Sequence, residues 1–453
     1  MYAQFFRNII FPATCWLRRV PTTKRHRQLQ DSQWQSPAEI KEIQNQKLRK
    51  LVQHAYENVP YYNRVLKERS LTPGDIATVD DLHKLPILDK GSIRNNFPDK
   101  IVARNVRKGE LMPSRTAGST GEPLHFYVDR RSRSFCRAAF YRFLKWMGIE
   151  IGDTIAQIWA GPELNKTKGR RVSELKKSML RIVTLNALKM DERHLATYAE
   201  KLAKLKPKLL YGYPSSMYIL AEYMDKIGAK VEHDLAVSTT AEVLPNHQRD
   251  FIESFFHCRI FDLYGCGELN SIACECEKHD GLHIATEHVI VEILPDGNSR
   301  SNAESGLVVI TDLENYGMPF IRYANGDRSL LLKESCTCGR GLPLMASIEG
   351  RIYDVIRGLN GNTIYGGFIH KILFGQLDWI SRFGIRQYQV IQETDRDLTV
   401  KIVSDIRPPR NDEEQLTPII HRYLGRMNVR IQYVEGISPG ESGKTRFVIS
   451  KIN

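Results

Sequence analysis

The chain has 453 residues, 42% hydrophobic and 26% charged, a composition typical of a globular protein with a large domain and a smaller one. The formal net charge is +13, and eight cysteines are too few for a disulfide scaffold, which favours a reducing, cytoplasmic compartment. No apolar run approaches the roughly 20 residues that cross a bilayer, so the sequence predicts no transmembrane segment.

The first predicted unit is a basic arm over residues 1–37. Its first 30 residues carry six Lys or Arg and no acid, together with several large apolar residues. The segment lacks the clean apolar core and small-residue cleavage site of a signal peptide. Two interpretations stay open, namely an arm packed on its own domain and a peripheral contact with an anionic membrane surface.

The next segments predict a layered α/β domain over residues 38–350. Apolar residues recur at helical spacing over 38–57 and indicate an amphipathic helix that ends near Pro60. From about 150 to 330, short apolar runs such as RIFDLYG alternate with helical stretches. The predicted helices are 192–205, 215–227 and 246–257, and the predicted strands include IAQIWAG, KLLYGY, RIFDLYG and LVVITDL.

After Gly350 the pattern changes to that of a small α+β domain, predicted over residues 351–453. We expect a helix near 366–379, two strands in RQYQVIQE and DLTVKIV, a helix over 411–424 and a final strand near 429–434. The boundary is predicted at 350–354.

The stretch from Ser114 to Pro123, SRTAGSTGEP, is a candidate phosphate-binding loop. Its glycines allow close approach of the backbone, and its hydroxyls and amides can donate to phosphate oxygens. The GK[ST] ending of a P-loop is missing. Alone, such a loop is more often a plain turn.

Further motifs follow in a fixed order. They are TTAE at 239–242, YGCGE at 264–268, TD at 311–312, RY at 322–323, GD at 326–327, GR at 350–351 and GK at 443–444. This order resembles that of the adenylate-forming enzymes. The phrases LVQHAYENVPYYNRVL, DLHKLPILDK and LLYGYPSSM resemble the phenylacetate-CoA ligase/CapK branch in particular, and the similarity covers residues 38–450.

The resemblance implies a large multi-layer AMP-binding domain and a small mobile C-terminal domain. It also implies that ATP and Mg²⁺ activate a carboxylic acid as an acyl-adenylate, whose acyl group then passes to an acceptor. Coenzyme A is the expected acceptor. The alternatives are an amine or amino sugar, since CapK-like proteins are linked to surface-polysaccharide biosynthesis, and a non-catalytic protein that retains the fold.

The resemblance also assigns expected roles to residues. Glu268 matches a magnesium ligand, Asp327 the acid that holds the ribose hydroxyls, and Arg351 an arginine at the domain junction. Lys444 matches a lysine that reaches the carboxylate and the α-phosphate during adenylation. The remaining residues expected at the nucleotide are Ser114, Thr116, Gly118, Ser119, Thr120, Gly121, Thr240, Glu242, Tyr264 and Gly265.

After Arg351 the sequence departs from the wider superfamily. The usual pattern has two acids after one variable position, whereas here Ile352 and Tyr353 precede Asp354. Which residue acts as the hinge therefore stays open.

A second constellation consists of cysteines and histidines. Cys276, His283, Cys336 and Cys338 can complete a closed tetrahedral zinc site, which would be structural. Their spacing resembles a zinc knot of this branch. Cys274 and His279 are the rival ligands, and buried free thiols are the alternative without a metal.

Two further expectations concern partners. No nucleic-acid recognition motif accompanies the positive charge, so we expect no nucleic-acid partner. The partners are instead expected to be a small carboxylic acid and its acyl acceptor. The sequence does not identify the acid, because the residues that would line its pocket are scattered through the large domain.

Overall fold

The computed structural model describes most of the chain. The described residues are 2–17, 20–116, 124–159, 179–295, 305–351, 355–360, 363–365, 379–438 and 446–452.

The N-terminal region is helical. The predicted helix at 38–57 is confirmed as α4, and it begins with a capping box in which Ser36 and Glu39 satisfy each other's backbone N–H groups. Pro37 occupies the first turn, where a missing N–H costs nothing. The helices in this region are α1 (Tyr2–Phe5), a π-helical turn (Phe6–Ile10), α2 (Phe11–Leu17), α3 (Thr22–Ser32), α4 (Pro37–Asn58), α5 (Pro60–Glu68) and α6 (Lys90–Asn96), with 3-10 turns at Pro73–Asp75, Val79–Lys84 and Lys108–Glu110.

An eight-stranded sheet forms the centre of the large unit, with the order β13-β9-β8-β7-β6-β5-β3-β4. The five strands from β4 to β7 run parallel, and helices connect them, as the alternation of the sequence predicts. The strands are β3 (Ile155–Trp159), β4 (Ile182–Asn186), β5 (Leu209–Gly212), β6 (Ala236–Thr240), β7 (Ile260–Tyr264), β8 (Ala273–Glu275), β9 (Leu282–Ile284) and β13 (Leu344–Met345). The helices are α9 (Glu192–Leu205), α10 (Pro214–Lys226) and α11 (Asn246–Phe256), close to their predicted bounds.

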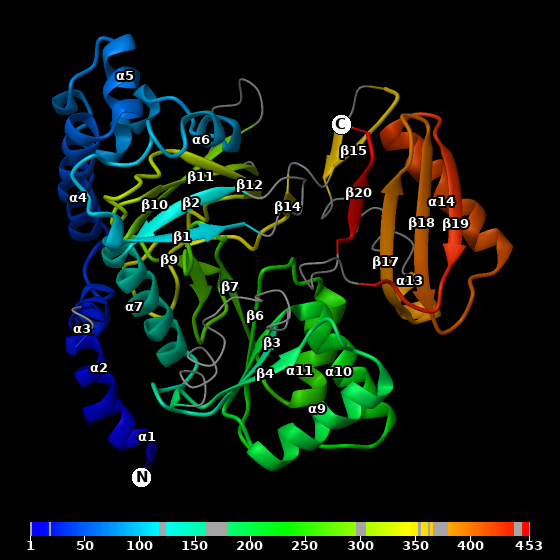
Figure 1. The fold of residues 1–453 in the computed structure, drawn as a ribbon. Coiled ribbons are helices and arrows are strands. Elements are labelled where there is room, and N and C mark those ends of the chain that lie inside the picture. The colour runs from blue at the N-terminus through cyan, green and yellow to red at the C-terminus, as the bar shows by residue number, and fades with distance from the viewer. Residues whose placement is uncertain are drawn as a thin grey trace.

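A second sheet has the order β10-β11-β12-β14 and is antiparallel throughout. It shares a buried hydrophobic cluster with α4, α5 and the hairpin β1-β2. Helix α7 follows the hairpin and runs toward the eight-stranded sheet (Figure 1). The elements are β1 (Leu111–Arg115), β2 (His125–Asp129), α7 (Arg130–Trp146), β10 (Val289–Pro295), β11 (Gly306–Asp312), β12 (Tyr323–Ser329) and β14 (Gly350–Arg351).

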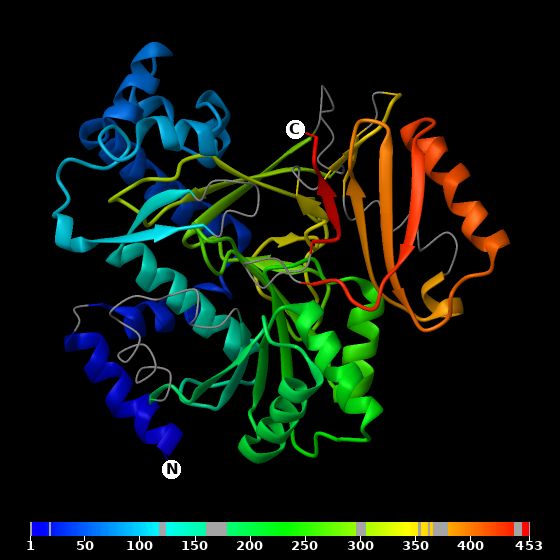
Figure 2. The ribbon, with the colours of Figure 1, turned by 45° about the vertical axis from the view of Figure 1, so that its right-hand side comes forward.

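The C-terminal part is built on a mixed sheet with the order β19-β18-β17-β20, which both ribbon views show beside the large unit (Figures 1 and 2). It has a hydrophobic cluster of its own, drawn only from residues 356–448. The elements are β15 (Val355–Arg357), β16 (Thr363–Tyr365), α13 (Trp379–Phe383), β17 (Ile385–Gln392), β18 (Asp397–Ser404), α14 (Arg410–Leu424), β19 (Asn428–Tyr433) and β20 (Val448–Ser450).

Two expectations for this part need comment. The strand at 429–434 is not the last one, because β20 follows it and pairs in parallel with β17. That strand has only three residues and carries too short a pattern to be read from sequence. Most of the helix expected near 366–379 lies outside the described residues.

Candidate active site and metal centre

Two of the predicted motifs lie at the carboxyl ends of neighbouring parallel strands. Thr240 ends β6 and Tyr264 ends β7, and Thr240 pairs with Leu263 in the ladder. Ligands of parallel sheets bind beyond the carboxyl ends of the strands. The loops that begin at these two residues therefore stand side by side where a ligand is expected.

Asp327 contacts the second of these loops, which begins at Tyr264, through the side chain of Tyr264. The Tyr264 hydroxyl donates to Asp327 Oδ2 over 2.9 Å. Asn325 donates through Nδ2 both to the Tyr264 hydroxyl (2.7 Å) and to Asp327 Oδ2 (2.6 Å). Burial, followed by the charge of Asp327, raises the pKa of Tyr264 well above its usual value, so its hydroxyl stays protonated and donates. The three side chains orient one carboxylate oxygen of Asp327.

Glu268, at the end of the same loop, is buried and is also held by a tyrosine. The Tyr323 hydroxyl donates to Glu268 Oε1 over 2.5 Å. Burial, followed by the charge of Glu268, raises the pKa of Tyr323 far above its usual range. The loop therefore presents a carboxylate in a fixed position, and carboxylate oxygen is the ligand type that Mg²⁺ prefers.

Strand β12 supplies all three side chains that bind the loop from the other sheet. Tyr323, Asn325 and Asp327 alternate along it, and alternate residues of a strand point to one face. Of these three residues, only Asp327 is expected at the site from the sequence, and the role of Asn325 is not predicted. The alternation of residues in YANGD could have predicted this role, because in a strand it places the polar side chains of residues 325 and 327 on the same face as Tyr323.

The predicted phosphate-binding loop connects β1 and β2. Thr116 closes its base, because its N–H donates to the Leu124 carbonyl over 3.0 Å and its hydroxyl accepts from the Leu124 N–H over 2.9 Å. A Cβ on Gly267 would lie 3.8 Å from Thr116 Cγ2, so the hairpin end adjoins the YGCGE loop. Ser114 lies in β1, and Gly118, Ser119, Thr120 and Gly121 lie outside the described residues.

The TTAE motif has contacts of its own. Glu242 Oε2 accepts from the Ser215 N–H over 3.2 Å, at the first turn of α10, where the helix dipole favours a negative charge. Thr240 is buried. Gly265, in the next loop, is tightly packed, because a Cβ there would lie 3.0 Å from the Ser271 nitrogen.

The last two predicted catalytic residues belong to the C-terminal side of the site. The backbone of Arg351 in β14 pairs with that of Asp327 in β12, which places the expected junction directly opposite the expected ribose-binding acid. Lys444 lies outside the described residues.

The four preferred metal ligands come together in one cluster. Their ligand atoms all lie within 4.8 Å of one another, and the residues are Cys276, His283, Cys336 and Cys338. Cys276 Sγ is 3.6 Å from Cys336 Sγ, and Cys338 Sγ is 3.3 Å from His283 Nε2. Bonds of about 2.3 Å to a tetrahedral zinc would place two sulfurs about 3.8 Å apart, whereas a disulfide would bring them to about 2.0 Å.

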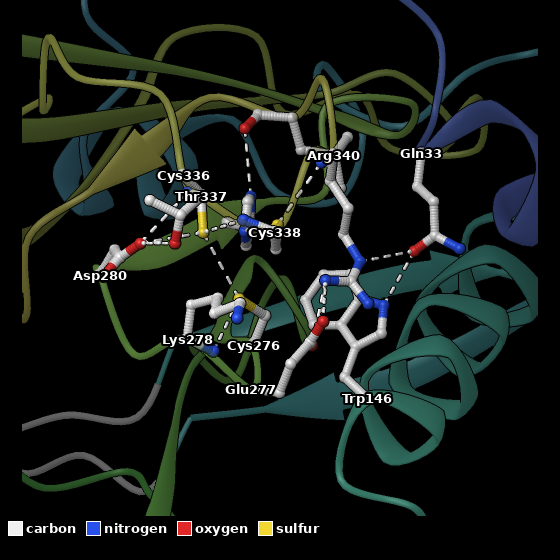
Figure 3. Close-up of polar contacts among 12 residues, drawn as sticks. Gln33, Trp146, Cys276, Glu277, Lys278, Asp280, Cys336, Thr337, Cys338 and Arg340 are labelled. Atoms are coloured by element: carbon white, nitrogen blue, oxygen red, sulfur yellow. Dashed lines mark hydrogen bonds and ion pairs between the residues drawn. The ribbon is translucent and has the colours of Figure 1, made fainter.

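The surroundings of the cluster suit a metal. The Leu342 carbonyl lies 3.1 Å from His283 Nδ1, which leaves Nε2 for coordination. Backbone N–H groups of Lys278, Cys338 and Arg340 point at the three sulfurs over 3.4 to 3.5 Å, as expected for groups that stabilise thiolates. Arg340 then reaches Glu277 and Gln33, and Gln33 bonds Trp146 (Figure 3).

The two rival ligands lie outside this group. Cys274 is fully buried in β8, where it pairs with Leu263 of β7 on one side and with His283 of β9 on the other. His279 Nδ1 lies 3.2 Å from Glu275 Oε2, and its ring packs 4.8 Å from that of Phe261. Neither residue belongs to the group of four.

Comparison with known proteins gives relatives over most of the chain. Residues 360–451 match the model of the CapK C-terminal domain family. Phenylacetate-coenzyme A ligase of Thermus thermophilus is 26% identical over 331 residues, which cover 71% of this chain and 73% of the ligase. Protein CapK of Staphylococcus aureus is 23% identical over 417 residues, 91% of this chain and 89% of CapK.

The fold has solved counterparts. A 2-hydroxyisobutyryl-CoA ligase in its postadenylation state, bound to R3-HIB-AMP, superposes with a TM-score of 0.71 at 21% identity, covering 93% of this chain and 91% of the ligase. The same ligase with 2-HIB-AMP and CoA in the thioesterification state gives 0.60 at 22% identity, covering 91% and 90%. With the relatives above, this fold defines an adenylate-forming ligase. Within that class, the chain is similar over most of its length to phenylacetate-CoA ligases and to CapK, and its residues 360–451 match the CapK C-terminal family.

Proposed function

We propose that this protein activates a carboxylic acid with ATP and transfers the acyl group to coenzyme A. In the first step a carboxylate oxygen attacks the α-phosphorus, the bond to the β-phosphate oxygen breaks, and pyrophosphate leaves. In the second step the thiol sulfur of coenzyme A attacks the acyl carbon, loses its proton, and AMP leaves. The observation that carries the proposal is the convergence of Tyr264, Glu268 and Asp327 beside the base of the β1-β2 hairpin.

The ribose and the adenine are assigned to the Tyr264 loop. Asp327 accepts the two ribose hydroxyls, and its bonds to Tyr264 and Asn325 hold the carboxylate in place before the nucleotide arrives. Tyr264 and Gly265 flank the adenine. The tight packing of Gly265 against the Ser271 nitrogen leaves no room for a side chain at this point and fixes the backbone of the loop.

The triphosphate is assigned to the hairpin loop and to Glu268. The Thr116 hydroxyl accepts from Leu124, so its own proton stays available to a phosphate oxygen. We assign Ser114, residues 118–121, Thr240 and Glu242 to the same cradle. A buried carboxylate beside the cradle fits Mg²⁺, which would offset the repulsion between the triphosphate and the incoming carboxylate. We assign this ion to Glu268.

Two residues from the C-terminal side complete the assignment. Arg351 is placed near the ribose or the phosphates, which its backbone pairing with Asp327 supports. Lys444 is assigned to the carboxylate and the α-phosphate during adenylation only.

We further assign a structural zinc ion to Cys276, His283, Cys336 and Cys338. The sulfur spacing, the aligned N–H groups and the orientation of His283 support a closed site with no open position for substrate. None of the eight cysteines is in a disulfide, which with the use of ATP and coenzyme A supports a cytoplasmic location.

The function can be tested by a pyrophosphate-release screen over aryl, fatty, hydroxy and amino acids. We expect one class to release pyrophosphate with ATP and Mg²⁺, with the acyl-adenylate visible by mass spectrometry, and the acyl-CoA to form once coenzyme A is added. Glu268→Gln should abolish release, whereas Glu39→Gln, which changes a carboxylate at a helix cap, should not. If the folded protein releases no pyrophosphate with any of these acids, the proposal is refuted.

A second candidate acceptor is an amine or amino sugar of surface-polysaccharide biosynthesis. It is favoured by the match of residues 360–451 to the CapK C-terminal family, since this part of the chain would approach the acceptor. Supplying the acyl-adenylate with coenzyme A, simple amines or amino sugars in parallel separates the two. Amide formation without thioester formation would select the second candidate.

A further inference from the structure

The N-terminal helix that runs through α1, the π-helical turn and α2 is apolar on two sides. One side packs on the body of the protein, where Phe6, Phe11 and Cys15 are buried against Tyr141 and its neighbours. The other side is open to solvent. It carries Phe5, Ile9, Trp16 and Leu17, which we call the exposed apolar face. Tyr2 is also exposed, but its hydroxyl donates to the Met179 carbonyl over 2.9 Å and its ring stacks on that of Phe6.

This face is unusual for its density. The described residues include twelve large apolar side chains that are exposed, and five of them fall within these sixteen residues. Trp16 is 79% exposed and Leu17 71%. Exposed apolar residues scattered singly are normal, whereas a contiguous group of them marks a contact surface.

The π-helical turn supports the grouping. Its wider turn adds a residue and so rotates the second half of the helix relative to the first. Buried Phe6 and Phe11 can thereby stay on one side while Ile9 and Trp16 stay on the other.

The charge around the face indicates its partner. The first 30 residues contain six Lys or Arg, and the first acid is Asp31. Arg7 lies 3.7 Å from Glu150, whereas Lys24 and Arg27 on α3 are exposed. A helix with aromatic and aliphatic residues toward one side and basic residues at its flank fits an anionic bilayer surface.

We propose that the exposed apolar face docks on an anionic lipid surface, with the helix lying in the interface. The described part of the chain has no helix long and apolar enough to cross a membrane, which fits surface attachment. Both ribbon views place α1 and α2 at the outer edge of the large unit, far from the sheet β17 to β20 (Figures 1 and 2). Attachment there leaves the proposed active site open.

The test is binding of the full chain to vesicles. We expect it to float with vesicles of phosphatidylcholine mixed with phosphatidylglycerol and not with phosphatidylcholine alone. Ile9→Ser/Trp16→Ser/Leu17→Ser should weaken this binding on the order of tenfold or more. The matched control is Ile227→Ser/Leu359→Ser/Ile406→Ser, three exposed apolar residues outside the face.

A second arm tests the charges. Lys24→Gln/Arg27→Gln should weaken binding to the anionic vesicles, as should salt that shortens the Debye length to about 3 Å. Thermal melting of each variant shows that the fold is intact, since none of these side chains is buried.

Three outcomes would overturn the proposal. They are failure of the parent to bind anionic vesicles, equal binding by the Ser variant and its control, and sedimentation data showing that the face instead joins two copies of the chain. The last would appear as a dimer that Ile9→Ser/Trp16→Ser/Leu17→Ser dissociates, without vesicle binding.

Discussion

Asp327 has neighbours that limit how it can interact with a nucleotide. Its Oδ2 is bonded by Tyr264 and Asn325, and its own N–H donates to Asn325 Oδ1 over 3.0 Å. A carboxylate anchored in this way loses little freedom when it accepts two ribose hydroxyls. Removing the anchor should therefore affect nucleotide binding more than the chemical step.

The first prediction separates the acid from its anchor. Asp327→Asn should lower acid-dependent pyrophosphate release by on the order of 10²-fold, because an amide has one accepting oxygen and cannot accept from both the ribose and the Tyr264-Asn325 pair. Asn325→Ala should chiefly raise the KM for ATP. As a control, Asp81→Asn changes a carboxylate that accepts from the Thr78 N–H in a helical turn and has no assigned role in the site. An unchanged KM in Asn325→Ala would contradict the anchoring role.

The second prediction concerns Asp312, a buried acid at the end of β11. Burial, with the nearby carboxylates of Asp129 and Glu314, raises its pKa to about 7. The unfolded value is about 3.9. Because the folded pKa is the higher one, its stabilising contribution is complete below about pH 4 and is lost as pH rises through 7, by up to about 1.4 kcal/mol per unit.

Asp312→Asn should remove the part of the pH dependence of the unfolding free energy that comes from Asp312. The Asn oxygen can accept from the Glu314 N–H and its amide can donate to the Ser132 hydroxyl, so the packing is preserved. Between pH 5 and 7 the free energy of unfolding of the parent should fall relative to that of the variant. Parallel curves from denaturant titrations at several pH values would show that Asp312 does not titrate in this range.

Among the helices and strands, those determined by a contiguous pattern of residues could be predicted from the sequence, whereas contacts between distant segments could not. Helix α4 could be predicted because its apolar spacing and its Ser36-Glu39 cap are contiguous in the chain. The contact of Tyr323 with Glu268 could not, since it depends on β12 crossing a loop 55 residues away. The π-helical turn could not be predicted either. The spacing of apolar residues is compared with an α-helical period, which does not include the wider π-helical turn.

The metal cluster is held by elements from distant parts of the chain, and it carries the third prediction. Cys276 and His283 belong to the β8-β9 region, while Cys336 and Cys338 lie before β13. Cys336→Ser should lose zinc and thermal stability together, because structural zinc contributes directly to folding. Elemental analysis and melting curves measure both.

Cys274→Ser is the matched control, since Cys274 is a buried cysteine that pairs with His283 but lies outside the group of four. It should keep one zinc per chain even where its melting temperature falls. Purified parent protein that melts normally and holds no zinc would contradict the assignment.

At the scale of the molecule, the chain superposes better on the ligase in its postadenylation state than on the same ligase in its thioesterification state, with TM-scores of 0.71 and 0.60. The large unit carries the described side chains of the proposed nucleotide site, while Lys444 belongs to the C-terminal part. A turn of that part about residues 350–354 would bring the lysine to the site and carry it away.

The fourth prediction follows from this division. Lys444→Ala should slow adenylation by on the order of 10²-fold or more, equivalent to about 3 kcal/mol of transition-state stabilisation. With synthetic acyl-adenylate supplied, the same variant should transfer the acyl group at nearly the parent rate. Lys451→Ala, which removes a surface partner of Glu393 in the same part of the chain, is the control. An equal loss of rate in adenylation and in acyl transfer would contradict a mechanism in which Lys444 acts in adenylation only.

The pairing of Asp327 with Arg351 gives this rotation a geometric consequence. Strand β14 is the last described strand before the proposed pivot, so Asp327, the acid that we assign to the ribose, would lie close to the axis of such a rotation. Points near an axis travel little while distant points sweep a long arc. In the proposed mechanism the AMP portion would therefore stay bound in one pocket during both adenylation and acyl transfer, while the C-terminal part changes position between the two reactions.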